Sequence, residues 1–338
     1  MFLIGIINVI ILKKYTHEAL KIKTPAEFEF QALKTFHFQY QNLSVYRQFV
    51  DLLGINPTQI KASQDIPFLP ISFFKTHSVI PENHEPTLTF MSSGTTGMER
   101  SKHLVFDLEI YEESFRKGFQ YFYGDIDEYT ILALLPSYLE QGESSLVYMV
   151  DDLIQRSNNP DSGFYLDNYS ELVEKLATLD QAGIKTILLG VSYALLDLTE
   201  QFDLQLKHTI VMETGGMKGR RREMVKEELH TILKAGFGVH QIHSEYGMTE
   251  LLSQGYSKGN GIFQTPPWMK ILIRDATDPL TLLDYNQSGG INVIDLSNFY
   301  SCAFIATQDL GKMHSKDTFS ILGRFDNSDI RGCNLLLA

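Results

Sequence analysis

The sequence is poor in cysteine and has no excess of positive charge. Only two of its 338 residues are cysteines, Cys302 and Cys333. A secreted fold held by disulfides is therefore not expected, and a cytoplasmic protein is the better expectation. The formal net charge of −12 at pH 7 argues against non-specific nucleic-acid binding. The shortage of cysteine and the lack of a His-x-x-x-His pair argue against a zinc cluster.

The sequence also lacks long apolar runs and repeats. An apolar run, MFLIGIINVIIL, covers residues 1–12, but it is too short to cross a bilayer. No basic region precedes it and no clear cleavage site follows it, so it fits a signal peptide poorly. It is interpreted as a buried first element, an over-extended start or a membrane-surface contact. A soluble protein without a transmembrane segment is therefore expected.

The composition is that of a globular protein with a sizeable core, at 43% hydrophobic and 21% charged residues. The N-terminal quarter has the spacing of amphipathic helices, and helical and extended segments alternate after the first 90 residues. This alternation predicts an α/β domain with ligands at the carboxyl ends of its strands. Strands are expected at 130–137, 185–191 and 208–216, and helices at 108–123 before Gly124, at 144–157, from Asn168, and at 220–236 with Gly236 as its end.

Shorter strands with turn signals follow from residue 269 and predict a smaller β-rich subdomain. They are expected at 269–275, 289–296, 302–311 and 319–324. The chain is thus divided into a helical N-terminal region at 1–89, an α/β core at 90–268 and a β-rich subdomain with a C-terminal tail at 269–338.

One loop carries a chemical signal. The stretch FMSSGTTGMERSKH occupies residues 90–103. Its glycines permit positive φ and close backbone approach, and its hydroxyls and amides supply donors to phosphate oxygens. It lacks the Gly-Lys-Ser/Thr of a Walker A loop, and a polar turn is the alternative interpretation. The anion-binding candidates are Ser92, Ser93, Gly94, Thr95, Thr96 and Gly97, followed by the basic Arg100.

Three later segments give this loop a function. They are SEYGMTE at 244–250, TQDLG at 307–311 and GRFDNSDIRG at 323–332. In this order, the loop and the three segments resemble the core motifs of the adenylate-forming superfamily, which includes acyl-CoA synthetases, luciferases and peptide-synthetase adenylation domains. The resemblance covers roughly residues 90–333. It implies an α/β fold with a large adenylating domain and a smaller β-rich subdomain, ATP and Mg²⁺ as ligands, and conversion of a carboxylate to acyl-AMP.

For the nucleotide, the resemblance implies a role for several residues. Asp309 would accept the two ribose hydroxyls, which suits an acceptor-only carboxylate, and Arg324 would lie near the ribose and phosphate. Gly215 and Gly216 would pack against adenine. The loop at 92–97 would hold the β- and γ-phosphates, and the residues lining the adenine and acyl sites would be Tyr246, Gly247 and Met248.

For catalysis, the resemblance implies that Thr249 contacts the adenylate phosphate and that Glu250 holds Mg²⁺, while Arg100 stands where relatives often have lysine. Attack of a carboxylate on the α-phosphorus brings negative charges together, so cations and backbone donors must neutralise them. The stretch LLPSYLEQGESSLVYM resembles the acyl-pocket motif. Its substrate-binding candidates are Tyr138, Gly142 and Ser144.

The sequence departs from the superfamily pattern at its C-terminus. Relatives continue into a small domain that carries a lysine needed for adenylation, whereas this sequence stops at Ala338, and that domain is expected to be lacking. The near-terminal Cys333 and the stretch FLPISFFKTHSVI resemble one branch, the acyl-protein synthetases of bacterial fatty-acid reductase complexes. That branch implies a fatty acid substrate, transfer of the acyl group to Cys333 as a thioester, and delivery to a reductase subunit.

Other interpretations stay open at this point. One is a phenylacetate–CoA ligase-like protein without its C-terminal domain, and another is a non-catalytic nucleotide- or acyl-binding partner. Cys302 lies in an apolar strand pattern and is expected in the core. His77, His103 and His243 lie near motifs, where a structural role is at least as expected as a chemical one. Association into homo- or hetero-oligomers is open.

Overall fold

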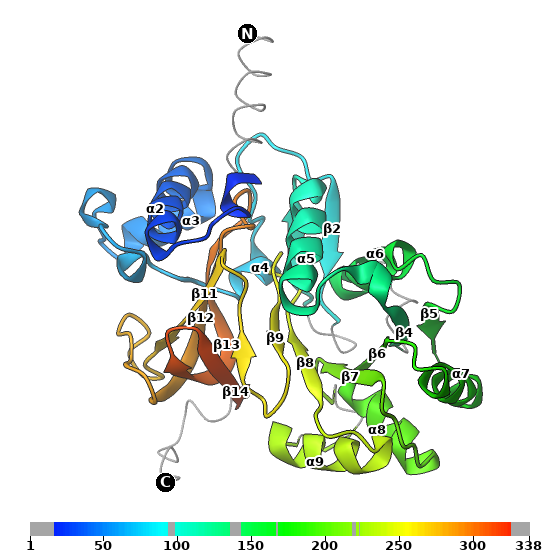
Figure 1. Ribbon diagram of the computed structural model, residues 1–338. Helices are drawn as coiled ribbons and strands as arrows, with labels where there is room; N and C mark the ends of the chain where they lie inside the picture. Colours follow the sequence, from blue (N-terminus) through cyan, green and yellow to red (C-terminus); the bar gives the residue numbers. More distant parts are fainter. Residues whose placement is uncertain are drawn as a thin grey trace.

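The computed structural model describes residues 17–93, 99–135, 143–166, 168–217, 221–222 and 224–325 (Figure 1). Several residues singled out in the sequence lie outside these ranges. They are the N-terminal run 1–12, Gly94, Thr95, Thr96, Gly97, Tyr138, Gly142 and Cys333. Within the described ranges, no helix has both the length and the apolar character needed to cross a membrane.

Two amphipathic helices open the described fold, as the sequence predicts. Helix α2 covers Pro25–Asn42 and begins in a capping box, where Thr24 Oγ1 accepts from the Glu27 N–H and the Glu27 carboxylate accepts from the Thr24 N–H. Helix α3 covers Ser44–Leu52. Both helices belong to the same apolar cluster as Phe304 of the sheet. The short elements that follow are η1 Pro57–Gln59, η2 Ser63–Asp65, β1 Leu69–Pro70 and α4 Phe73–Thr76.

A 12-stranded mixed sheet forms the centre of the molecule. In spatial order its strands are β11 Met269–Arg274, β12 Ser288–Asp295, β13 Phe304–Ser315, β14 Thr318–Arg324, β10 Phe263–Gln264, β9 Gly255–Ser257, β8 His243–Tyr246, β7 Thr209–Thr214, β6 Thr186–Val191, β4 Thr130–Leu134 and β5 Gly163–Tyr165, with β1 beside β13. The run from β8 to β5 is parallel. From β8 to β11 in this spatial order each successive pair is antiparallel, whereas β1 pairs with β13 in parallel. A separate antiparallel pair, β2 Leu88–Met91 and β3 Lys102–Val105, flanks the loop predicted to bind phosphate.

Five longer helices accompany the parallel strands: α5 Leu108–Tyr123, α6 Ser145–Arg156, α7 Tyr169–Gln181, α8 Ser192–Gln201 and α9 Lys226–Phe237. A single turn, η3 Ile126–Glu128, follows α5. Helix α5 ends at Gly124, with φ of 87°, and Asn168 caps α7 by accepting from the Glu171 N–H, both as predicted.

The prediction for α9 was wrong at both ends. The helix begins at Lys226 rather than near residue 220, and it ends before Gly238, which adopts the left-handed conformation with φ of 66°. Gly236 lies inside the helix instead. A Cβ there would stand 2.4 Å from Thr199 Cβ, so this glycine allows α8 and α9 to approach closely.

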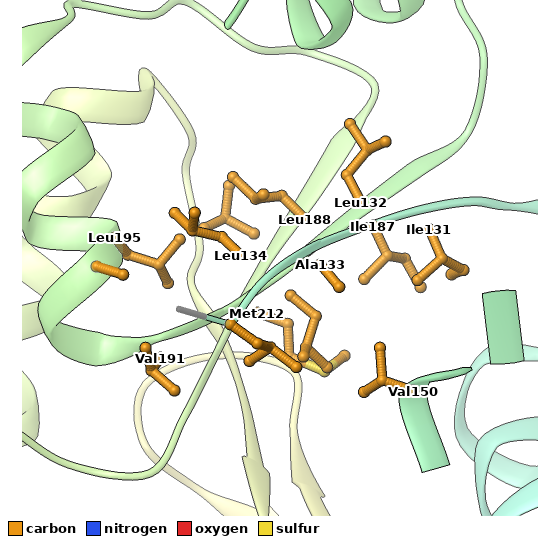
Figure 2. Packing of buried hydrophobic residues seen from close by; sticks show 14 of the residues in the cluster. Ile131, Leu132, Ala133, Leu134, Val150, Ile187, Leu188, Val191, Leu195 and Met212 are labelled. Atoms are coloured by element: carbon orange, nitrogen blue, oxygen red, sulfur yellow. The ribbon is translucent and has the colours of Figure 1, made fainter. Parts of the chain in front are cut away.

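Two large apolar clusters form most of the core of the described residues. One joins the parallel strands to α5–α9, and Figure 2 shows part of it, where Ile131, Leu132, Ala133 and Leu134 of β4 lie among side chains of α6, β6, β7 and α8. The other joins β11–β14 to α2 and α3. Strand β6 is buried along its whole length, as expected for a parallel strand covered on both faces. Strands β8 and β9 lie at the border, because Tyr246 belongs to one cluster and Tyr256 to the other.

The fold class predicted from the sequence is confirmed. Helices α6 and α7 lie at the β4–β5 end of the sheet, and α2 and α3 lie at the β11–β13 end (Figure 1). The β-rich strands from residue 269 continue the same sheet as the parallel strands. The three regional boundaries stay predictions.

Candidate active site

The segment 244–250 leaves the carboxyl end of β8 and forms the centre of the candidate site. At Gly247, an added Cβ would stand 2.4 Å from Glu245 Oε1, so a larger residue would displace the buried Glu245 carboxylate. Two buried side chains hold the next carbonyls. A ring nitrogen of His103 contacts the Thr249 carbonyl at 2.7 Å, and Asn298 Nδ2 donates to the Glu250 carbonyl at 2.7 Å. The turn that carries Thr249 and Glu250 is therefore fixed from both β3 and the 295–301 turn.

Glu250 is a buried carboxylate among cationic groups. Its side chain is 5% exposed, and burial raises its pKa, while a hydrogen bond from Ser101 and the positive charges of Arg324 and Lys75 oppose the rise. Its carboxylate oxygens are ligands of the kind that a hard divalent cation such as Mg²⁺ prefers. Ser101 and Lys75 were not predicted as site residues. Lys75 lies in the stretch FLPISFFKTHSVI. This stretch resembles the acyl-protein synthetases, but the resemblance gave Lys75 no role.

Asp309 of β13 contacts three residues of the sheet, namely Tyr246 of β8, Arg324 of β14 and Thr307 of its own strand. The Tyr246 hydroxyl donates to Asp309 Oδ2 at 2.8 Å, and Arg324 Nε lies 3.2 Å from Oδ1. The Asp309 N–H donates to Thr307 Oγ1 at 3.1 Å. Burial raises the pKa of Asp309, and the Arg324 charge and the Tyr246 hydrogen bond oppose the shift. The structure thus brings together three predicted nucleotide residues that are far apart in the sequence.

The two ends of the predicted phosphate loop are held together. The Ser92 N–H donates to the Ser101 carbonyl at 3.0 Å, and the Ser101 N–H donates to Ser92 Oγ at 2.9 Å. Arg100 Nε donates to the Ser92 carbonyl at 2.5 Å, and Arg100 Nη1 lies 3.4 Å from Glu143. Ser93 is exposed. These contacts place Ser92, Ser93 and Arg100 in one loop base; the residues at 94–97 lie outside the described ranges.

Arg100 supplies a test of whether an anion fits. Its Nη2 atom is buried and has no hydrogen-bond acceptor among the described residues. A buried guanidinium nitrogen without an acceptor is costly, and an anionic oxygen would satisfy it. The donor set around the loop base therefore fits a phosphate group.

The remaining predicted residues have local roles that fit the site. Gly215 follows β7 with φ of 68°, and its carbonyl accepts from Ser192 Oγ at 3.2 Å. Gly216 comes next, at the same carboxyl end of the parallel strands. Ser144 caps α6 by accepting from the Val147 N–H at 3.4 Å. Because the Met91 N–H donates to the Glu143 carbonyl at 2.9 Å, Ser144 lies near the phosphate loop base.

Two buried glutamates behind the site have opposite electrostatics. Burial alone would raise the pKa of Glu213, but the Lys226 charge and hydrogen bonds from its neighbours lower it to about 2. Burial raises the pKa of Glu245 to about 7, against a hydrogen bond donated by the Thr214 hydroxyl. Sequence reasoning gave neither residue a role, although Glu245 lies within SEYGMTE at 244–250 and Glu213 lies two positions before Gly215.

The cysteine and histidine expectations can be compared with the structure in part. Cys302 is fully buried, its Sγ contacts the Phe304 carbonyl at 3.3 Å, and burial raises its pKa to about 12, so it is an unreactive core thiol as predicted. Burial lowers the pKa of His103 to about 4, and its contact with Thr249 gives it a structural role. Cys333 lies outside the described residues.

Two polar features lie elsewhere. Ligand atoms of His17, Asp107 and Glu109 lie within 4.8 Å of one another at the start of α5, but His17 is already paired with Glu113, and we assign no metal there. A cavity of about 350 Å³ lies beside β5 and α7. Its lining residues, which include Asp161 and Lys175, contain none of the predicted site residues.

Comparisons with known proteins agree with this geometry. No family model matches the chain. Over 329 residues the chain is 23% identical to the long-chain-fatty-acid–luciferin-component ligase of Vibrio harveyi, covering 90% of this chain and 85% of that protein. The structure of this chain resembles that of 2-hydroxyisobutyryl-CoA ligase in the postadenylation state, with a TM-score of 0.64 and 10% identity. The match covers 89% of this chain and 68% of the ligase.

A second solved ligase gives the same result. ATP-bound MatB from Rhodopseudomonas palustris matches with a TM-score of 0.53 and 18% identity over 70% of this chain. The chain spans only 47% of the length of that ligase. The resemblance predicted from the loop and the three later segments is confirmed by these matches, and the chain has the fold of the adenylate-forming ligases.

Proposed function

We propose that this protein activates a carboxylic acid with ATP to form acyl-AMP and then transfers the acyl group to its own Cys333. The observation that carries the first half is the meeting of Asp309, Tyr246 and Arg324 beside the buried Glu250. This arrangement supplies an acceptor for ribose hydroxyls and a site for a cation, with an exposed guanidinium close by. The fold and the curated relative support an adenylate-forming acyl ligase.

In the first step, a carboxylate oxygen of the acid attacks the α-phosphorus of ATP and pyrophosphate leaves. Glu250 would hold Mg²⁺, which neutralises polyphosphate charge when bound. Arg100, whose Nη2 has no acceptor among the described residues, and the phosphate loop would receive the β- and γ-phosphates. Thr249, Tyr246, Gly247 and Met248 would line the nucleotide and acyl groups, and Gly215 and Gly216 would pack against adenine.

In the second step, the Cys333 thiolate attacks the acyl carbon, the carbon–oxygen bond to phosphate breaks, and AMP leaves. Phe325 is held at the site, because its N–H donates to the Gln308 carbonyl at 2.8 Å, next to Asp309. Cys333 is eight positions further along the chain. An extended chain of that length reaches at most about 27 Å. This limit is compatible with Cys333 reaching an acyl-adenylate bound beside Glu250 and Asp309.

Relatives and sequence support our proposal for the acid and the partner. The name of the Vibrio harveyi protein supports a long-chain fatty acid as substrate. Tyr138, Gly142 and Ser144 would contribute to its binding. A thioester on a protein cysteine needs an acceptor, and we infer a reductase subunit in a cytoplasmic setting, with the protein alone or in an oligomer.

Adenylation is tested by fatty-acid-dependent exchange of labelled pyrophosphate into ATP. We expect exchange by the wild-type protein, loss of at least about 100-fold in Glu250→Gln because the cation site is removed, and no change in Glu227→Gln, an exposed carboxylate on α9. Wild-type protein without exchange would overturn the adenylation step. Exchange followed by release of acyl-CoA when coenzyme A is added would favour a coenzyme A ligase, the activity named for one solved neighbour.

A further inference from the structure

Arg274, the last residue of β11, is a buried cation that none of the predicted motifs includes. Its side chain is 9% exposed. Nη1 donates to the Ile291 carbonyl at 2.7 Å and to Asn292 Oδ1 at 2.8 Å, and Nη2 donates to the Thr307 carbonyl. One guanidinium thus ties β11 to β12 and β13 at a single point.

That point is an irregularity of the sheet. The register between β12 and β13 shifts between Gly290 and Asn292. The guanidinium passes directly over Gly290, where an added Cβ would stand 2.5 Å from Arg274 Cζ. The guanidinium therefore fills the space that a side chain at residue 290 would take. Gly290 pairs with Leu310 and Asn292 with Ala306, so residues 307–309 lie opposite Ile291 alone and the bulge is in β13.

Asp309 belongs to this bulge of β13. Thr307, whose carbonyl accepts from Arg274, uses its hydroxyl to donate to the Ile291 carbonyl at 2.9 Å. The same hydroxyl oxygen accepts from the Asp309 N–H at 3.1 Å. Burial lowers the pKa of Arg274 to about 10, and the charge of Asp309 opposes that shift, so the two groups interact electrostatically. A continuous set of contacts leads from Arg274 through Thr307 to the Asp309 backbone.

We propose that Arg274 is a positioning residue that holds Asp309 in the orientation in which its carboxylate accepts the ribose hydroxyls of a nucleotide. The inference rests on the proposed function, because it requires Asp309 to bind ribose. Arg274 itself makes no contact with the nucleotide. Its role is to fix the β13 bulge and the Thr307 carbonyl, and so the direction of the Asp309 side chain.

The test compares ATP with 2′,3′-dideoxy-ATP, which lacks both ribose hydroxyls, by titration calorimetry. Wild-type protein should bind ATP at least about tenfold more tightly, the effect of about one charged hydrogen bond. Arg274→Met should reduce this ratio to about twofold or less while leaving the affinity for the dideoxy nucleotide unchanged, and Arg274→Lys should keep part of the ratio. Lys270→Met is the matched control on the same strand, where Lys270 pairs with Glu29, and should keep the full ratio.

Thr307→Val breaks the same set of contacts with little change of shape and should reduce the ratio even where Arg274→Met does not fold. Equal weakening of both nucleotides by Arg274→Met or Thr307→Val would overturn the inference and indicate a purely structural role. Wild-type protein that binds both nucleotides equally would overturn the ribose role of Asp309 and the inference with it. Wild-type protein that binds neither would overturn the proposed function itself.

Discussion

Replacing Tyr246 with phenylalanine removes one hydroxyl from the centre of the candidate site. That hydroxyl donates to Asp309 Oδ2 at 2.8 Å, and both side chains are buried. Phenylalanine keeps the ring, whose centroid lies 6.2 Å from that of Phe263 and 5.9 Å from that of Phe319. The variant therefore removes the hydrogen bond and leaves the packing in place.

The size of the effect follows from the partners of Asp309. A hydrogen bond to a charged group contributes about 1.5–3 kcal/mol. Arg324 replaces little of it, because its side chain is 73% exposed and its charge is screened by solvent. We therefore expect Tyr246→Phe to weaken ATP binding by about 10- to 150-fold. Since the lost hydrogen bond lowers the pKa of Asp309, the variant needs a higher pH to ionise the carboxylate, and the loss should grow as the pH is lowered.

Titration calorimetry with ATP measures this directly. Tyr40→Phe is the matched control, because the Tyr40 hydroxyl donates to Asp51 at 2.7 Å on the surface, away from the site. Its ATP affinity should equal that of the wild type. An affinity of Tyr246→Phe within about twofold of the wild type near pH 6 would refute the assignment of Asp309 to the nucleotide.

Three further predictions concern charge. Lys226→Met leaves the fully buried Glu213 without its cation and should destabilise the protein by about 3–5 kcal/mol. Lys175→Met, the control, breaks a surface ion pair and should barely change the melting temperature. Similar melting temperatures of the two variants would contradict this prediction. Burial raises the pKa of Glu245 from 4.5 to about 7, so the folded protein keeps a proton that the unfolded chain loses, and wild-type stability falls as pH rises through this range. In urea unfolding, the free energy of unfolding of Glu245→Gln relative to that of the wild type should therefore increase by about 3 kcal/mol between about pH 4 and pH 8. Parallel pH dependences of unfolding free energy for the two proteins would refute this prediction. Lys75→Met should slow pyrophosphate exchange by about tenfold or more, because a positive charge near Glu250 is lost. Lys61→Met, which replaces an exposed lysine, should not slow it. Equal exchange rates of the two variants would argue against a role for Lys75.

The sequence could predict local features of the fold, such as strands and helix ends. It could not predict which of these segments lie next to one another in space. Apolar runs marked β4, β6 and β7, and Gly124 marked the end of α5, because these signals lie within each segment. The end of α9 was missed because periodicity cannot distinguish a glycine that ends a helix from one that permits close packing. In α9 these are Gly238 and Gly236.

The same limit applies to the site. The resemblance supplied Tyr246, Glu250, Asp309 and Arg324, but the hydrogen bond from Tyr246 to Asp309 depends on the order of strands between β8 and β13. The roles of Lys75 and Arg274 come from tertiary packing and from a register shift, neither of which leaves a pattern of spacing in the sequence.

Acylation of Cys333 tests the central proposal most directly. The protein is incubated with ATP, Mg²⁺ and a radiolabelled long-chain fatty acid, and label on the protein is measured before and after hydroxylamine, which cleaves thioesters. We predict hydroxylamine-labile label on the wild type and on Cys302→Ala, the buried-thiol control, and none on Cys333→Ser, which should still exchange pyrophosphate into ATP. Label that persists on Cys333→Ser, or its absence from wild-type protein that forms acyl-AMP, would contradict transfer to this cysteine.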